Sequence, residues 1–485
     1  MSVLGIDVGT STCKGVVLSS DGRILAQAYQ NYTQKPSIYE DKAEIDVNVF
    51  KEGVFAVIKK LATAVKGQDE IQSIALSTHG ETLIPVDKDG NPLCPAMLSM
   101  DRRCVAQKEK IASEIGEKEF YFICGTPLHT QYPMPKILWL KENQPQIVEQ
   151  TATFCTTQDY LHLCLGVGRF VDYSLASRFG GFDIRQRQWS DKILEVIGVG
   201  KDKFSTPAPS GTVIGTISKK IADSLGLSGD VSVVLGGHDQ PCSALGMGAK
   251  DGVMTVSAGS YECISIATDE PLNTDEGYRY GLNSYCHVLN GKYVTLAFFA
   301  SGLTVSWYVD TFCQGKYTLD ELEKLTPKNN TGICFTPHVY GSMNPCWNDK
   351  QTAKIVGMTA ETTVGGLYKA LLEGASCELD LNVQVLEKLS QPMHGLTFCG
   401  GGTKSDLWMN LRADILGREI YRLDGGVDCS CMGAGILAGI GVGVFKDTQT
   451  ALQKICYQKT AFTPKNAQNY AGQKQDYKRI TGVEI

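Results

Sequence analysis

The sequence predicts an α/β fold built as two large domains. The chain has 485 residues, more than a single hydrophobic core usually covers. Several apolar, strand-like runs end in turns rich in glycine or hydroxyl groups, and helix-forming sequence follows two of these turns. Hydrophobic residues make up 43% of the chain, and its 51 glycines indicate many tight turns or close backbone approaches.

Composition and charge favour a small-molecule partner. The formal net charge is −6, whereas nucleic-acid and membrane-surface binders concentrate basic charge, so we expect neither partner. The start of the chain lacks the pattern of a signal peptide, and no run of about 18 apolar residues follows. The 17 cysteines show no zinc-site spacing and are expected to be buried, reduced thiols. These features predict a cytoplasmic protein.

The first informative stretch, VLGIDVGTSTCKGVVLSSDG at residues 3–22, predicts a β-hairpin with a polar tip. An ordinary polar turn is the alternative, but it gives no reason for a carboxylate, small donors and a lysine so close together. Hydroxyls and amides of such a tip can bind phosphate oxygens while Asp7 holds a hydrated Mg²⁺. The candidate phosphate-binding residues are Thr10, Ser11, Thr12 and Lys14.

The stretch VSVVLGGHDQPCSALGM at residues 231–247 predicts a strand, two glycines and a helix rich in small residues. Asp239 stands where the helix begins. A carboxylate at the carboxyl end of a strand can remove a proton from a substrate hydroxyl. This stretch alone leaves open the alternative that Asp239 only caps the helix by accepting from its first amides.

A second hairpin turn is predicted within MTVSAGSYE at residues 254–262, where a strand meets Gly259 and Ser260. The resemblance of this turn to the first one makes it a second candidate phosphate site.

A third glycine turn lies in FCGGGTKSDLW at residues 398–408, between a strand and a helix that begins near Ser405 or Asp406. It is not a Walker A loop, because that loop needs a lysine directly after its glycine and Thr403 intervenes here. Glycines let a flat ring or a phosphate approach the backbone closely. We expect this turn to support the nucleoside of a nucleotide whose phosphates lie on the hairpin turns.

In this order, the stretches resemble the FGGY carbohydrate kinases, the group that includes xylulokinase, glycerol kinase, ribulokinase and gluconokinase. The resemblance covers almost the whole chain. CGTPLHTQYPMPKILWLKEN (124–143) and IVGMTAETTVGGLYKALLEGA (355–375) look like the two family signatures, and VDYSLASRFGGFD (171–183) resembles the D-x-S-x-A-S segment. MGAGILAGIGVG (432–443) looks like the closing Gly–Ala helix, which we expect to pack tightly and to bind no ligand.

The resemblance implies the actin/Hsp70-like ATPase fold (ribonuclease H-like) with an interdomain cleft. We place the domains at 1–245, with the sugar or polyol and the first phosphate hairpin, and at 246–485, with the second phosphate turn and the adenosine loop. The family suggests a possible homodimer, and it implies ATP and Mg²⁺, with Asp239 as catalytic base and Asp7 as the Mg²⁺-linked acid. By matching position, the further ATP-binding residues are Gly259, Ser260, Gly302, Ser306, Gly401, Gly402 and Asp406.

In the segments that would bind the sugar or polyol, the phosphoryl acceptor, the sequence combines features of two kinds of FGGY kinase. In LSTHGETL (76–83), the His-Gly pair looks like that of xylulokinases, whereas Glu-Thr looks like the Arg-Glu-Thr of glycerol kinase with Gly80 in place of the arginine. In MLSMDRRC (97–104), Ser99 replaces the usual tryptophan of Trp-x-Asp-x-Arg. A packed structural histidine is the alternative for His79, but its position favours a bond to a sugar hydroxyl. The candidate substrate-binding residues are Thr78, His79, Glu81, Asp101, Arg103 and Gln240.

The resemblance therefore implies in-line transfer of the ATP γ-phosphoryl group to a primary hydroxyl of a small sugar or polyol. A ketopentose such as xylulose is the first expectation. Glycerol, a tetritol or an aldonate such as gluconate is the alternative acceptor. More remote alternatives are a non-catalytic actin-like ATPase, which would give the acceptor-side residues no purpose, and a sugar sensor, which would not need complete phosphate hairpins.

Overall fold

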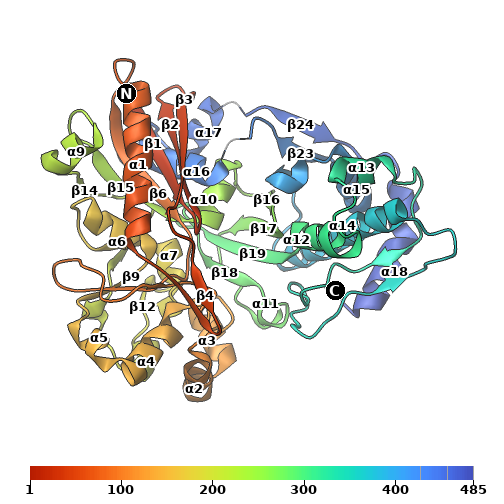
Figure 1. Ribbon diagram of the computed structural model, residues 1–485, viewed down its shortest axis with the longest axis horizontal. Coiled ribbons are helices and arrows are strands. Elements are labelled where there is room, and N and C mark those ends of the chain that lie inside the picture. The colour runs from red at the N-terminus through yellow and green to blue at the C-terminus, as the bar shows by residue number, and fades with distance from the viewer. Residues whose placement is uncertain (427, 456, 484) are drawn as a thin grey trace.

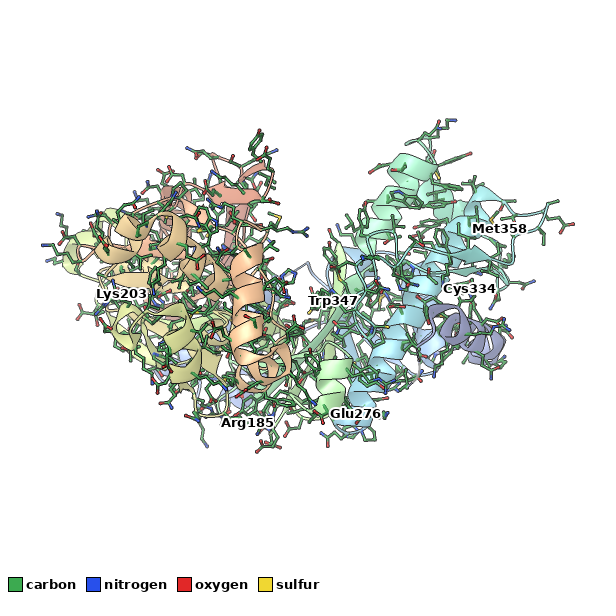
Figure 2. All side chains as sticks on the ribbon, turned by 90° about the horizontal axis from the view of Figure 1, so that it is seen from below. Arg185, Lys203, Glu276, Cys334, Trp347 and Met358 are labelled. Carbon is green, nitrogen blue, oxygen red and sulfur yellow. The ribbon has the colours of Figure 1, made fainter. Side chains whose placement is uncertain are left out.

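The protein consists of two α/β halves, which lie side by side in the computed structural model (Figure 1). The structure describes residues 1–426, 428–455, 457–483 and 485. Figure 2 shows the halves from below, with Lys203 in one half and Cys334 and Met358 in the other. Each half is built on a mixed sheet that combines an antiparallel meander with added parallel strands.

The N-terminal sheet has the order β14–β15–β6–β1–β2–β3. β1, β2 and β3 are antiparallel neighbours, and β6 and β15 run parallel to β1. The parallel strands are buried almost throughout because helices pack on both faces of the sheet. The strands are β1 (Ser2–Val8), β2 (Thr12–Ser19), β3 (Ile24–Asn31), β6 (Ile71–Thr78), β14 (Val213–Thr216) and β15 (Ser232–His238).

Helix α1 (Asn48–Val65) covers one face of this sheet. Helices such as α4 and α5 and several small strands form a lobe below it, whereas α9 and α10 lie beside the sheet (Figure 1). The helices are α2 (Val105–Ile115), α3 (Glu117–Cys124), α4 (Pro133–Asn143), α5 (Pro145–Gln150), α6 (Thr157–Cys164), α7 (Tyr173–Ser177), α8 (Asp191–Ile197), α9 (Lys219–Leu225) and α10 (Asp239–Gly246). The small strands are β4 (Ser37–Tyr39), β5 (Lys42–Ile45), β7 (Ile84–Val86), β8 (Ala96–Met97), β9 (Thr153–Cys155), β10 (Phe170–Asp172), β11 (Phe182–Asp183), β12 (Gln188–Trp189) and β13 (Thr206–Ala208).

The C-terminal sheet has the order β18–β19–β17–β16–β22–β23–β24. β16 and β17 form the second predicted hairpin, and β22 adds parallel to β16, as β6 does to β1. The strands are β16 (Val253–Ala258), β17 (Tyr261–Thr268), β18 (Asn283–Cys286), β19 (Tyr293–Ala300), β22 (Gly395–Cys399), β23 (Ile420–Leu423) and β24 (Lys459–Phe462), and β20 (Cys334–Phe335) pairs with β21 (Ile355–Val356) outside the sheet.

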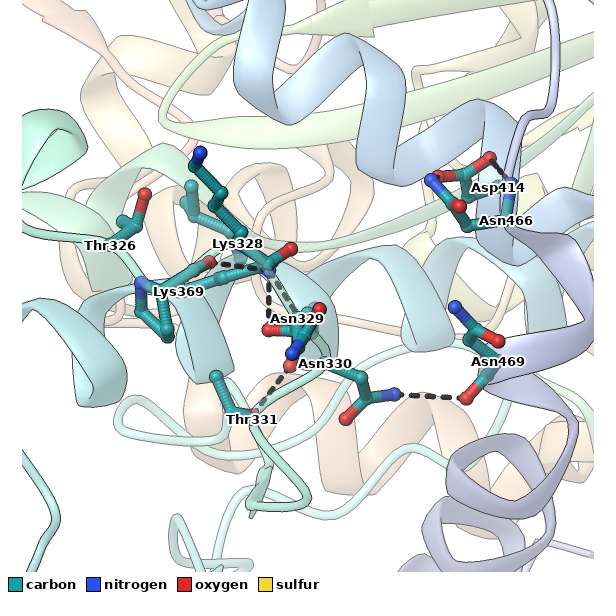
Figure 3. Close-up of polar contacts among 12 residues, drawn as sticks. Thr326, Lys328, Asn329, Asn330, Thr331, Lys369, Asp414, Asn466 and Asn469 are labelled. Carbon is teal, nitrogen blue, oxygen red and sulfur yellow. Dashed lines mark hydrogen bonds and ion pairs between the residues drawn. The ribbon is translucent and has the colours of Figure 1, made fainter.

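The long helix α14 (Val364–Leu389) runs through the core of the C-terminal half. Its buried Lys369 donates to the backbone carbonyls of Pro327, Lys328 and Asn329 at 2.8–3.2 Å and so fixes the preceding loop (Figure 3). The other helices of this half are α11 (Asp275–Arg279), α12 (Gly302–Trp307), α13 (Leu319–Lys324), α15 (Asp406–Leu416), α16 (Cys429–Gly441), α17 (Thr448–Lys454) and α18 (Ala471–Thr481).

Helix α16 follows the C-terminal strands in sequence but packs on the N-terminal sheet and on α10. A Cβ added at Gly5 would lie 2.0 Å from the carbonyl oxygen of Cys431, and one added at Gly433 would lie 1.9 Å from that of Cys242. Only glycine permits backbones to approach so closely. The predicted tight packing of the Gly–Ala segment is thus confirmed.

Among the described residues, no helix has the length and apolar character that a membrane crossing requires.

Candidate active site

Three parallel strands of the N-terminal sheet end together and bring the candidate residues to one edge. Val8, Thr78 and His238, at the ends of β1, β6 and β15, lie in register with one another. The loops that follow carry the first hairpin tip, the 79–82 segment and Asp239, which are far apart in sequence. Carboxyl ends of parallel strands are where open α/β sheets place their sites.

The first hairpin forms as predicted. The Gly9 amide donates to the Thr12 carbonyl at 2.9 Å, and the tip residues Thr10 and Ser11 are exposed. Ser77 Oγ donates to Asp7 Oδ1 at 2.9 Å, and Lys14 Nζ donates to Asp428 at 2.8 Å. Lys14 therefore connects the hairpin with the N-terminal end of α16.

Asp7 is the candidate metal-linked acid. Burial, followed by the charges of Asp428 and Asp239, raises the pKa of Asp7 well above its usual value. Neighbouring carboxylates in a buried site repel one another, and a cation bound there would relieve the repulsion. Among the described residues, no group of three or more His, Cys, Asp or Glu side chains is arranged to hold a metal ion. The buried negative charge at Asp7 fits a Mg²⁺ that keeps phosphate oxygens and water among its ligands, which is the usual mode for this ion.

The second hairpin turn is joined to the start of α12. The amides of Ser301 and Leu303 donate to the Ser260 carbonyl at 3.1 and 2.8 Å. A Cβ added at Gly302 would lie 2.4 Å from the Gly259 carbonyl oxygen, so the turn tolerates no side chain there. Ser306 is exposed on the same helix. The structure thus brings together the predicted nucleotide residues of these two segments.

The glycine turn after β22 lies against the second hairpin. A Cβ added at Gly400 would lie 2.5 Å from the Ala258 carbonyl oxygen, and one added at Gly402 would lie 3.3 Å from the same atom. Asp406 begins α15 and accepts from Arg422 at 2.6 Å. A cavity of about 590 Å³ opens here, and its lining includes Gly400, Gly401, Lys404, Arg422, Gly426 and Tyr457.

Asp239 is the first residue of α10, directly after β15. The N-cap position belongs to His238, whose side chain makes no capping bond. The Asp239 carboxyl interacts with the backbone amide of Gln240 in the first turn, so part of the capping alternative holds for it. Burial, followed by the nearby charge of Glu81, raises the pKa of Asp239 to about 7. His238 Nε2 lies 3.2 Å from Asp239 Oδ1, and His238 Nδ1 lies 2.7 Å from the Tyr285 hydroxyl. Gln240 follows Asp239 at the half-buried start of the helix.

Glu81 is held from two sides. Its φ of 62° is uncommon for a residue other than glycine. The buried Lys136 Nζ donates to its carbonyl oxygen at 2.9 Å, and Arg178 Nε donates to its carboxylate at 2.6 Å. Burial by itself would raise the pKa of Glu81, but Arg178 and other cationic neighbours outweigh it and hold the pKa below its usual value. Glu81 is therefore an ionised, fixed acceptor beside Asp239.

Asp101 and Arg103 form a buried pair rather than two independent ligands. Asp101 is fully buried and accepts from the Ala43 amide at 3.0 Å and from Arg103 Nη2 at 2.8 Å. Arg103 also pairs with Glu44 at 2.6 Å and lies over the Trp139 ring, 4.7 Å from its centre. Trp139 thus supplies an aromatic ring near this pair, although Ser99 replaces the usual tryptophan.

The structure places His79 differently from the expectation. His79 Nδ1 lies 2.9 Å from the Val8 carbonyl oxygen, and Nε2 lies 3.1 Å from Thr157 Oγ1. Because both ring nitrogens have partners inside the protein, the geometry favours the packed alternative, and direct contact with a sugar remains a prediction. The neighbouring Thr78 Oγ1 is buried without a hydrogen-bond partner among the described residues.

Sequence reasoning missed three residues of the acceptor side: Arg178, His238 and Tyr285. Arg178 lies just after α7, within the D-x-S-x-A-S-like segment, which in the sequence indicates the family but no contact. His238 precedes Asp239 and is visible in the sequence as a histidine at a strand end. Tyr285 lies on β18 of the C-terminal half, and no local signal in the sequence indicates that it contacts the N-terminal half.

Comparison with known proteins supports the family resemblance over almost the whole chain. A model of the N-terminal domain of the FGGY family of carbohydrate kinases matches residues 2–246, and a model of the C-terminal domain of that family matches residues 254–442. A xylulose kinase of Staphylococcus epidermidis is 28% identical, with 96% of this chain and 92% of the relative covered. A gluconokinase of Bacillus subtilis is 27% identical over 90% of this chain and 86% of its own.

The fold is shared with solved structures. A xylulose kinase from Lactobacillus acidophilus superposes with a TM-score of 0.90 at 21% identity, covering 99% of this chain and 98% of its own. The predicted two-part, actin/Hsp70-like architecture is confirmed.

Proposed function

Since the chain belongs to the FGGY family of carbohydrate kinases and is thus an ATP-dependent phosphotransferase, we propose that Asp239 accepts the proton of a primary acceptor hydroxyl during in-line transfer of the γ-phosphoryl group. The observation that supports this most directly is the position of Asp239. It emerges at the same sheet edge as Asp7, and the charges of the two carboxyls act on each other.

The raised pKa of Asp239 suits this role. A carboxyl group with a pKa of about 7 is ionised in a large fraction of molecules at neutral pH and binds a proton more strongly than an ordinary aspartate. The substrate proton therefore passes to a base whose affinity matches the pH at which it works.

The two hairpin turns are proposed to hold the phosphates. Negative charge spreads over the phosphoryl oxygens during transfer. The amides and hydroxyls at Thr10–Thr12 and at Gly259–Ser260 would donate hydrogen bonds to these oxygens, and Lys14 would add a positive charge. Mg²⁺, when bound with ATP beside Asp7, supplies further positive charge to the phosphates. The glycine turn at 400–402 and its cavity are proposed to take the adenosine.

The acceptor is proposed to be a small sugar, with a ketopentose such as xylulose first. Relatives named xylulose kinase cover more than nine-tenths of the chain. A relative named gluconokinase has nearly the same identity, so an aldonate is the competing acceptor.

The experiment is ADP release from Mg-ATP by the purified protein, with xylulose, other ketopentoses, glycerol, erythritol and gluconate as separate acceptors. Acceptor-dependent ADP release, lost in Asp239→Asn, is expected. Release that no acceptor increases would contradict phosphoryl transfer to this panel and would favour an ATPase.

A further inference from the structure

The most unusual feature of the acceptor side is a buried arginine that closes a network between the two halves. Arg178 is 7% exposed. Its Nε and Nη2 contact Glu81 Oε1 at 2.6 and 2.5 Å, and Nη1 donates to Asn283 Oδ1 of the C-terminal half at 3.1 Å. Its orientation is therefore fixed by one carboxylate and one amide oxygen.

Aromatic rings fix the plane of this guanidinium as well. The Tyr132 and Tyr285 rings lie 5.1 and 5.0 Å from its central carbon. The Tyr132 hydroxyl also donates to Asn283 Oδ1 at 3.3 Å. A guanidinium between aromatic faces is stabilised by cation–π attraction and loses its freedom to turn toward another anion.

Gly80 makes room for this arrangement. A Cβ added there would lie 3.0 Å from the His238 ring and 3.3 Å from Arg178 Cβ. The space beside Glu81 is thus occupied by a guanidinium that comes from a segment nearly a hundred residues away, and not by the side chain of residue 80.

Three of the cations near the acceptor edge have partners within the described part of the chain. Lys136 Nζ donates to the carbonyls of Glu81, Leu98 and Gln131 at 2.7–2.9 Å. Arg103 pairs with Asp101 and Glu44, and Arg178 pairs with Glu81. With Asp239 ionised, these three cations face four carboxylates. Arg102, which lies next to Asp101, is a further cation, but its side chain is exposed.

We infer that the Arg178–Glu81 pair makes this site selective for an uncharged polyhydroxy acceptor, a ketose or polyol, against an aldonate. The inference rests on the proposed function and specifies its acceptor. The carboxylate of an aldonate would need a cation here, and taking Arg178 would leave Glu81 buried and unpaired, which is costly.

Glu81 itself offers the contact that an uncharged acceptor needs. Both Arg178 contacts end on Oε1, and within the described part of the chain Oε2 accepts no hydrogen bond. A sugar hydroxyl can donate to Oε2, whereas a carboxylate cannot donate and would be repelled. The pair thus attracts a hydroxyl and rejects an anion of similar size.

The first test is calorimetric titration of the wild-type chain, without ATP, with xylulose, glycerol, erythritol and gluconate. The dissociation constant of the best uncharged compound is expected to be at least about 100-fold lower than that of gluconate, the scale typical of discrimination by buried polar groups. Gluconate binding as tightly as the best uncharged compound, or no binding by any uncharged compound, would overturn the inference. ADP release is measured separately, so binding without turnover would contradict only the proposed transfer.

Two variants test whether the Arg178–Glu81 pair causes the preference for uncharged compounds over gluconate. Glu81→Gln removes one negative charge and frees the guanidinium, so the preference for the uncharged compound should fall at least about 10-fold. Arg185→Gln is the matched control, because Arg185 lies just after the segment of Arg178 but pairs with Glu270 at an exposed site (Figure 2). The Arg185→Gln variant should prefer uncharged compounds over gluconate to the same extent as the wild type.

Arg178→Gln leaves a buried, unpaired Glu81 and can fail to fold. The double variant Glu81→Gln/Arg178→Gln replaces the pair with two neutral amides and avoids this problem. Lost preference with unchanged ADP affinity in the double variant would support the inference. Preference equal to the wild type in both Glu81→Gln and the double variant would overturn it.

Discussion

At Asp239, burial opposes ionisation and Glu81 adds a second negative charge, while Arg178 acts in the opposite direction. Neighbouring His238 stays neutral because burial lowers its pKa to about 3. The Asp239 carboxyl thus has a neutral imidazole 3.2 Å away, which adds no positive charge on that side. Position at the sheet edge and a pKa near neutrality are the two requirements of a general base.

Replacing Asp239 by Asn should lower kcat by at least about 100-fold, because general-base assistance typically contributes that much. Acceptor affinity should stay within about 3-fold of the wild type, since the amide keeps the size of the side chain. Steady-state ADP release and calorimetric titration measure the two quantities. Turnover near the wild-type rate would remove Asp239 from the mechanism.

The pH dependence of kcat/KM should have an acidic limb near pH 7. The base works only when ionised, so activity should fall about 10-fold per pH unit as the pH drops below the pKa of about 7. A limb near pH 4 would show that the carboxyl is not perturbed in solution.

Whereas activity should rise with pH, the contribution of Asp239 to folding stability should fall as the pH rises. The folded-state pKa of Asp239 lies above the unfolded value of 3.8, so folding binds the proton and this contribution is present below pH 3.8. It is lost as the pH rises through about 7. Asp239→Asn should therefore raise Tm more at pH 8 than at pH 5, as measured by calorimetry. An equal effect at both pH values would argue against the shift.

Sequence alone indicated Asp7, Asp239 and the glycine turns because each lies at or directly after the carboxyl end of a strand, where local pattern is informative. It could not predict the Arg178–Glu81 pair, whose members are 97 positions apart. It also favoured ligand contact for His79, whose two partners, Val8 and Thr157, come from other elements. Residue types at strand ends are readable from sequence, whereas their partners depend on tertiary packing.

At the scale of elements, the hairpins and the strand-to-helix turns were predictable from short-range pattern, and the Gly–Ala segment was predictable as a tightly packed helix. The packing partners of α16 could not be predicted from the sequence, because its contacts with β1 and α10 join distant parts of the chain. A Cβ added at Gly5, Gly246 or Gly433 would lie only about 2 Å from a backbone carbonyl oxygen, so backbone contact replaces side-chain packing there.

Gly433→Ala should destabilise the protein by roughly 2–3 kcal/mol, because its added methyl group would meet the Cys242 carbonyl oxygen and force the helices apart. Gly472→Ala is the control, since this α18 glycine has nothing within 4 Å of the added Cβ. The control should be neutral or stabilising by up to about 1 kcal/mol. Denaturant unfolding measures both, and equal stabilities would show that α16 can shift without cost.

At the scale of the whole molecule, the boundary proposed near residue 245 lies between the strands of the two sheets. It does not separate the halves structurally, because each half packs elements against the other. The apolar face formed by Val3, Val16, Leu18 and Val234 is covered by α16, which comes from the C-terminal half. In the other direction, β18 contributes Tyr285 and Asn283 to the acceptor edge. Each half therefore supplies residues to the core or the candidate site of the other half.

A fragment of residues 1–245 should lack a cooperative thermal transition, because its sheet would expose the face that α16 covers. Circular dichroism of the fragment, alone and after co-expression with residues 246–485, tests this. Co-expression should restore the transition of the intact chain. A fragment that melts cooperatively by itself would show that α16 is dispensable for the N-terminal half.

The position of α16 also has a consequence for biosynthesis. On the ribosome, the N-terminal sheet emerges nearly 200 residues before its covering helix. At about 5–20 residues per second, the apolar face waits roughly 10–40 s for its partner. During that interval the nascent chain presents a surface suited to chaperone binding, so the order of elements along the gene sets how long this enzyme depends on such protection.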